Sequence, residues 1–221
     1  MTTTRRLTRM PYKQSAERPD LDKLLDESIW GQVAFVDDLG HPQIVPVAVA
    51  RHRDELIWHG STGSTWLRLI SGAREVAVSV SSIEALVVGR SRLESSFWYR
   101  SAVIYGQPRR LEDGELDHAL NVLTDHVLPG RVTETRSSSK SELAATLVLA
   151  LPISDWILKE SYEWPDDRKP TAKPTCGREP SRFARCTPSP SQPPTCVGPS
   201  RFRSHVGALP DRIGERSGPG Q

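Results

Sequence analysis

Short apolar runs separated by turn residues cover most of the first 164 residues of the chain. Gly31 to Val36 is rich in β-forming residues, and the polar segment Asp37 to Gly40 after it has the composition of a turn. From Tyr99 to Arg109 two kinds of side chain alternate, which predicts a strand with two different faces. Further strands are predicted at 44–49, 55–59, 75–82, 85–90, 144–153 and 156–161, with 75–82 and 85–90 paired across a short turn.

Three segments have helical periodicity. One starts near Asp20, a candidate N-cap, one follows Ser64 and runs to Ile70, and one spans 115–127. Pro46 lacks an N–H donor, which predicts an edge or a bulge in its strand. Because the strands follow one another like hairpins and the helices interrupt them irregularly, we expect an α+β fold built on an antiparallel barrel with flanking helices.

Composition divides the chain at about Trp164. The 221 residues have a formal charge of +2, but residues 1–164 carry a net charge of −3 and residues 165–221 a net charge of +5. The second part holds eleven of the eighteen prolines and few aliphatic residues, so we expect a folded domain at 1–164 and a disordered tail at 165–221. The near-balance of charge argues against a nucleic-acid-binding protein.

Cysteine usage and hydropathy exclude further classes. Cys176, Cys186 and Cys196 form no CxxC pair, so we expect neither a metal site nor a disulfide framework. No apolar run approaches the ~20 residues that span a bilayer, and no apolar segment follows the charged N-terminus as in a secretion signal. We therefore expect a cytoplasmic protein that does not bind membranes.

Two segments carry candidate binding residues. Trp58 to Thr65 links a strand to a helix; its glycines and hydroxyls form either an anion site, with Arg68 one turn later, or an ordinary connection with a Ser cap. Trp58 and His59 are either the wall of a ring-binding site or a core Trp beside a surface His. Arg100 and Ser101, next to aromatic residues, either bind a heteroaromatic or phosphorylated ligand or lie on an exposed strand face.

No protein nucleophile or metal site is indicated. Ser137 to Lys140 matches the S-x-x-K pattern, but it lies in a polar loop without the partner motifs. His118 and His126 lie on one predicted helix and are typical of a solvated helix face. The catalytic residues are unknown from the sequence, and a bound cofactor is the expected source of any chemistry.

Four segments in order resemble the FMN-binding split-barrel family related to pyridoxamine 5′-phosphate oxidase, and most of all its branch of nitroimidazole-resistance proteins. They are GQVAFVDDLGHPQIVPVAVA, LIWHGSTGSTWLRLI, WYRSAVIYGQPRRLED and KSELAATLVLALPI, within about Leu21 to Ile153. The resemblance implies a homodimer with FMN at the subunit interface. It places Val45, Pro46 and Val47 along the isoalloxazine ring and Trp58 and His59 beside the ring or ribityl chain. Around the phosphate it places Gly63, Ser64 and Thr65, and it places Arg100 and Ser101 against the ring from the long strand.

The resemblance also implies a function. Flavin would carry electrons from NAD(P)H to a small acceptor such as a nitroaromatic compound. The oxidases have a basic pair where this chain has Thr65 and Trp66, so Arg68 is the expected substitute at the phosphate. The alternatives are the same barrel with deazaflavin or haem, with His59 as a contact, and a non-catalytic flavin-binding module.

The tail departs from the family pattern. Relatives commonly end with Trp-Ala-Gly-x-x-Pro, which the tail lacks. When Thr175 to Phe183 is back-translated with G/C-biased third positions and read one base earlier, the result is Val-Trp-Ala-Gly-Thr-Val-Pro-Val-Arg. Our hypothesis is a frame shift after about Arg168, which sequencing of the coding DNA tests.

Overall fold

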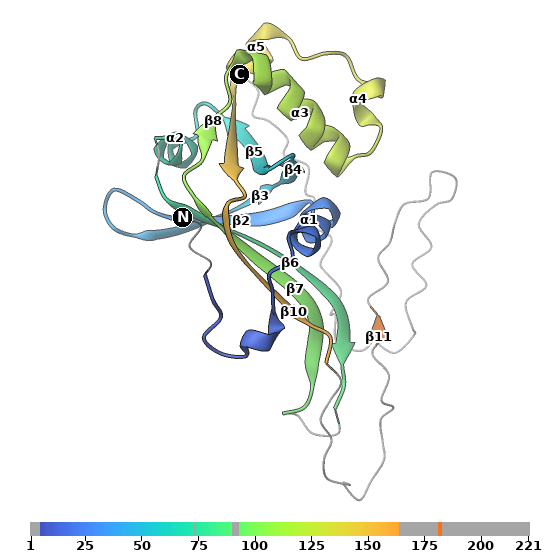
Figure 1. Ribbon diagram of the computed structural model, residues 1–221. Helices are drawn as coiled ribbons and strands as arrows, with labels where there is room; N and C mark the ends of the chain where they lie inside the picture. Colours follow the sequence, from blue (N-terminus) through green and yellow to red (C-terminus); the bar gives the residue numbers. More distant parts are fainter. Residues whose placement is uncertain (1–4, 73, 90–92, 164–180, 183–221) are drawn as a thin grey trace, which may run out of the picture. The chain divides into compact units, whose positions relative to one another are not determined.

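The computed structural model describes residues 5–72, 74–89, 93–163 and 181–182 (Figure 1). Contacts within the chain define two units, Met1–Phe183 and Ala184–Gln221, and all of the described residues belong to the first. The three cysteines and the predicted frame shift lie outside the described residues, as does all of the predicted tail except Ser181 and Arg182.

The larger sheet, here called sheet A, is antiparallel throughout. Its order is β1-β10-β7-β6-β2-β3, so β3 is an edge strand, as Pro46 predicts. Its strands are β1 (Gln14–Ser15), β2 (Trp30–Val36), β3 (Pro42–Ala48), β6 (Val76–Val87), β7 (Ser96–Gly106) and β10 (Asp155–Ser161), and β11 (Ser181–Arg182) pairs with β6.

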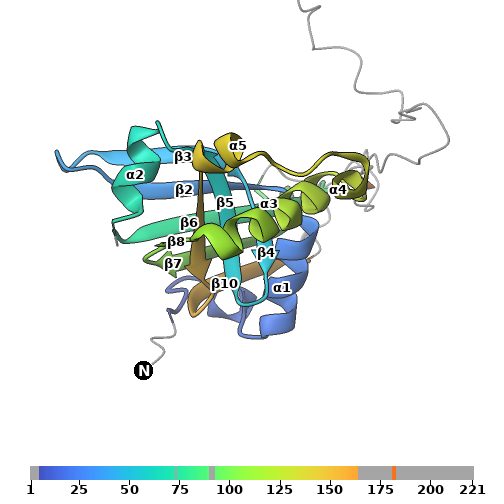
Figure 2. The same cartoon turned by 90° about the horizontal axis from the view of Figure 1, so that it is seen from above.

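The smaller sheet, sheet B, has the order β4-β5-β9-β8. Figure 2 shows α3 crossing it and α2 lying beside β2 and β3. The strands are β4 (Ala50–His52), β5 (Glu55–Ser61), β8 (Arg109–Arg110) and β9 (Thr146–Pro152). The helices are η1 (Pro11–Lys13), α1 (Arg18–Glu27), α2 (Thr65–Ile70), α3 (Asp113–Val127), α4 (Arg131–Glu134) and α5 (Lys140–Ala144).

Two apolar clusters hold these layers together. One lies between the two sheets and includes the fully buried Trp58. The other lies on the opposite side of sheet B, where Leu116, Ala119 and Leu123 of α3 pack on Ile57 and Ala150. The predicted antiparallel α+β fold with flanking helices is confirmed.

The structure corrects three predicted element boundaries. Asp20 lies in the first turn of α1, whose N-cap is Glu17, because Pro19 suits the first turn of a helix and allows an earlier start. Strand β5 continues through Gly60 to Ser61, because β9 pairs with it along its whole length. The two strands predicted at 75–82 and 85–90 are one strand, β6, with a register shift between Ile83 and Ala85.

That register shift is a β-bulge with a structural role. The extra residue is Glu84, whose carboxylate accepts hydrogen bonds from Arg100 at 2.6 and 3.1 Å. Glu27, at the end of α1, accepts another from Arg100 at 2.7 Å. The bulge therefore aims a carboxylate at Arg100 without interrupting the strand, and the ion pairs join α1 to β6 and β7.

Candidate functional site

The segment from Ser61 to Ser64 forms a compact turn between β5 and α2. The Ser61 hydroxyl accepts a hydrogen bond from the Gly63 N–H at 3.1 Å, and the Ser61 carbonyl accepts one from the Ser64 N–H at 2.9 Å. Thr62 donates to the carbonyl of Ala145 through its N–H. The first hydrogen bond of helix α2 runs from the Arg68 N–H to the Ser64 carbonyl. The N–H groups of the three residues before Arg68 therefore point toward the start of the helix and have no partner within it.

Arg68 lies beside this turn. Its guanidinium donates to the Thr62 carbonyl at 3.0 Å, which folds the side chain back over the turn. Among the described residues it contacts no carboxylate, whereas most other arginines of the domain do. The turn, the hydroxyls of Ser64 and Thr65 and this exposed cation together have the chemistry of a phosphate site.

Trp58 and His59 point to opposite sides of β5. Trp58 is fully buried between the sheets, and its indole N–H has no acceptor among the described residues. His59 is exposed on the other side of sheet B, next to Val148 on β9. Nearby atoms still desolvate the ring, which lowers the pKa of His59 and favours a neutral imidazole.

The strand β3 presents its predicted site residues in two directions. Pro46 is exposed on the outer face of sheet A, the face that points away from sheet B. Val47 is buried and Val45 half-buried on the inner face, where Val45, like Trp66 of α2, packs against the core cluster between the sheets. Helix α2 lies beside the edge strand β3 and begins directly after the turn at Ser61 to Ser64, so the turn and the edge strand are close to each other (Figure 2).

Arg100 and Ser101 also lie on opposite faces of their strand, β7. Arg100 is 5% exposed, and its guanidinium is held by Glu27 and Glu84. Burial opposes the charge of Arg100, but hydrogen bonds to the two carboxylates outweigh it and raise the pKa. Ser101 is half-buried on the outer face of sheet A, the same face as Pro46.

Both histidines of α3 make contacts that the sequence did not indicate. His118 lies edge-on against His52 of β4, with ring centroids 5.0 Å apart. At the other end of the helix, His126 is 2.8 Å from the Ser28 carbonyl. His118 is still exposed, as a solvated helix face predicts, whereas His126 is half-buried and departs from that interpretation. The pKa of His52 is lowered by burial and, to a smaller extent, by the charges of His118 and Arg53.

Acidification is expected to reduce the stability that His52 provides where it contacts His118. Because the folded-state pKa of His52 lies below its ordinary value of 6.5, the folded protein binds fewer protons than the unfolded chain. The resulting stabilisation is complete above pH 6.5 and is lost as the pH falls toward the folded-state pKa. Urea unfolding between pH 8 and pH 5 should show this loss as a fall in the free energy of unfolding. In His52→Gln the slope of this free energy against pH should be smaller. His41→Gln, at an exposed site, is the control; an unchanged slope in His52→Gln would refute the assignment.

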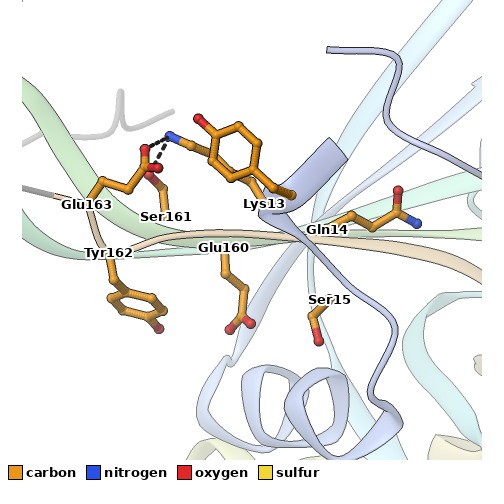
Figure 3. Close-up of a pocket in the computed structure, with 8 residues that line it drawn as sticks. Lys13, Gln14, Ser15, Glu160, Ser161, Tyr162 and Glu163 are labelled. Carbon is orange, nitrogen blue, oxygen red and sulfur yellow. Dashed lines mark hydrogen bonds and ion pairs between the residues drawn. The ribbon is translucent and has the colours of Figure 1, made fainter. Parts of the chain in front are cut away.

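A polar pocket of ≈ 470 Å³ lies between the start of the domain and the end of β10 (Figure 3). In it the ammonium of Lys13 is 2.9 Å from the Ser161 hydroxyl and 2.7 Å from the Glu163 carboxylate. A Ser–Lys pair acts as a nucleophile only when the amine is neutral. The hydrogen bond to Glu163 raises the pKa of Lys13, so this pair is structural.

In the part of the chain that the structure describes, no group of three or more His, Cys, Asp and Glu residues has a geometry that holds a metal ion. No helix of that part is long and apolar enough to cross a membrane.

Comparison with solved structures gives strong matches over nearly the whole chain. The FAD and heme binding protein from Mycobacterium smegmatis is 40% identical, with a TM-score of 0.74, over 90% of this chain and 94% of that one. The flavocytochrome Anf3 from Azotobacter vinelandii is 22% identical, with a TM-score of 0.72, over 93% and 92%. A 5-nitroimidazole antibiotic resistance protein from Bacteroides thetaiotaomicron is 20% identical, with a TM-score of 0.58, over 66% and 85%; like Anf3, it supports the fold alone.

Among curated proteins, none matches this chain. The sequence model of the family described as pyridoxamine 5′-phosphate oxidase matches residues 17–160, which is most of the described domain. The match covers all four segments on which the resemblance rests, and the relative from M. smegmatis is 40% identical over the same region and beyond. The chain therefore belongs to the pyridoxamine 5′-phosphate oxidase family.

Proposed function

We propose that the protein binds a flavin nucleotide and transfers electrons from NAD(P)H to a small acceptor. The observation that carries the proposal is the cation of Arg68, held over the turn before α2 with no carboxylate partner among the described residues. Family membership and the relative from M. smegmatis, which is named as a FAD and heme binding protein, support the same conclusion.

The residues fit a flavin phosphate at the turn. Gly63 lets the backbone approach closely, Ser64 and Thr65 offer hydroxyls, the Thr65 N–H is not used by the helix, and Arg68 supplies the charge. The ring would lie along the edge strand β3, where Pro46 is exposed; Ser101 lies on the same outer face but on β7, with β6 and β2 between the two strands. Val47, Trp58 and Arg100 are buried and would support this surface from below. A bound flavin supplies hydride and single-electron chemistry, while the protein orients it and excludes water.

The proposal includes a homodimer that covers the part of the outer face of sheet A around Trp30 and Pro46. Trp30 is 54% exposed on this face, and Pro46 is exposed on the neighbouring strand β3. Exposed apolar residues gathered on one sheet face are typical of an interaction surface. A second copy of the chain would bury them and complete the flavin site, as the family resemblance implies.

Haem is the second candidate cofactor. The relative that favours it is the FAD and heme binding protein at 40% identity. In this chain His59 is exposed, makes no hydrogen bond with the described residues and has a lowered pKa, so its imidazole is available as a ligand. Haem would bind in addition to flavin or in place of it.

The absorption spectrum of the purified protein tests these assignments. We expect flavin bands near 370 and 450 nm, the usual positions for oxidised flavin. After denaturation, chromatography of the released cofactor separates FMN, which we propose, from FAD and from deazaflavin. A Soret band identifies haem, and its loss in His59→Ala would identify the ligand. A colourless protein that binds neither added FMN nor added FAD contradicts the proposed function.

A further inference from the structure

A shallow groove of ≈ 550 Å³ lies on the outer face of sheet A, at the end of β3 and β6. One row of side chains crosses four neighbouring strands and forms its floor and walls: Ile44, Ala34, Ala77 and Tyr105. Val36 and Pro42 continue the apolar lining toward the β2–β3 turn. The volume is within the ~300–1,000 Å³ range of small-molecule sites.

Two polar side chains at the end of this groove, those of Arg74 and Gln43, already have partners. The guanidinium of Arg74 donates to the Val36 carbonyl at 2.7 Å and pairs with Asp38. The side-chain amide of Gln43 donates to Asp37 at 3.0 Å. Both groups are thus turned toward the hairpin, and Glu75 leaves an exposed carboxylate at the rim. The groove therefore favours a neutral, apolar ligand and disfavours an anion.

The groove adjoins the proposed flavin surface along β3. Pro46 lies two residues after Ile44 on the same face of β3. Pro46, the residue proposed to contact the flavin ring, is therefore next to the row of side chains that lines the groove. The side chain of Phe35 points to the inner face of sheet A, where it stacks on Trp66 of α2 at 6.1 Å between centroids. Helix α2 in turn begins at the proposed phosphate site.

We propose that this groove binds the electron acceptor, and that the acceptor is a neutral, flat, mainly apolar molecule of one or two fused rings. The inference rests on the proposed function, because only a flavin on the Pro46 row makes the groove an acceptor site. The ring of Tyr105, on which the guanidinium of Arg5 stacks at 3.8 Å while it pairs with Asp155, provides an aromatic wall, and Ala34 and Ala77 leave the floor flat enough for a ring to lie on it.

Methyl NMR of the full-length protein, without flavin, tests the binding site with menadione as the probe. We expect shifts at Ala34, Ile44 and Ala77. Ala77→Phe fills the floor and should weaken binding at least tenfold. Ile44→Glu alters only an exposed position, so it should fold normally and weaken binding as well. Ile83→Phe, on the same strand and face but at its far end, is the matched control and should bind menadione normally.

An anionic probe tests the inference that the groove favours a neutral ligand. The anionic analogue 1,4-naphthoquinone-2-sulfonate should bind at least tenfold more weakly than menadione. Equal binding of the two probes, shifts outside the groove, or no effect of Ala77→Phe would overturn the inference. Flavin affinity, measured separately by fluorescence, should be unchanged in Ala77→Phe. If wild-type protein binds menadione but no flavin, the proposed function and the acceptor role fail together; if it binds flavin but not menadione, only the inference fails.

Discussion

Replacing Arg68 with alanine should weaken binding of FMN about 10- to 100-fold. A hydrogen bond between charged groups contributes ~1.5–3 kcal/mol, which corresponds to this range. Arg68 is exposed and makes one hydrogen bond, to the Thr62 carbonyl, so its removal should leave the fold intact. Quenching of flavin fluorescence on titration with protein measures the affinity.

Riboflavin provides the control for the Arg68 experiment, because it has the same ring but no phosphate. Its affinity should be the same in wild type and Arg68→Ala. Arg131→Ala, which removes an exposed arginine paired with Glu134, should bind FMN like wild type. If Arg68→Ala weakens riboflavin as much as FMN, the residue does not bind the phosphate, and the placement of the flavin is wrong.

Replacing Arg100 with methionine should lower the free energy of unfolding by about 3 kcal/mol. The substitution keeps most of the side-chain volume but leaves Glu27 and Glu84 facing each other without the cation between them. Removing one partner of a buried ion pair costs ~3–5 kcal/mol, and the partial exposure of both carboxylates favours the lower end of that range. Urea unfolding monitored by tryptophan fluorescence measures the change.

Two variants make the Arg100 result specific. Arg109→Met breaks a more exposed ion-pair network with Glu55 and Glu115 and should cost about 1 kcal/mol or less. Combining Arg100→Met with Glu27→Gln and Glu84→Gln should recover much of the lost stability, because the repelling charges are removed. An Arg100→Met protein as stable as wild type would show that the ion pairs do not hold α1 on the sheet.

The fold was predictable where the signal is local. A run of β-forming residues identified β2, alternation identified β7, and Pro46 identified the sheet edge at β3. The single strand β6 was not predicted, because the expected turn between residues 82 and 85 is instead a bulge inside one strand. The bulge residue Glu84 is turned inward by Arg100, which is 16 residues away in sequence.

The candidate site was predictable only in part, because only some of its residues lie within one short segment of the sequence. The turn before α2 and Arg68 lie within one short segment, so composition and spacing could suggest an anion site. Neighbours in sequence do not share a surface on a strand, however, which is why the structure separates Trp58 from His59 and Arg100 from Ser101. The groove combines residues of four strands, and no local pattern marks it.

A crystal structure of the protein grown with FMN tests the central claim most directly. The account predicts the phosphate at the turn formed by Gly63 and Ser64, within hydrogen-bond distance of Arg68, and the ring against Pro46 at the edge of sheet A. Flavin bound elsewhere, or an empty turn at saturating FMN, would contradict it.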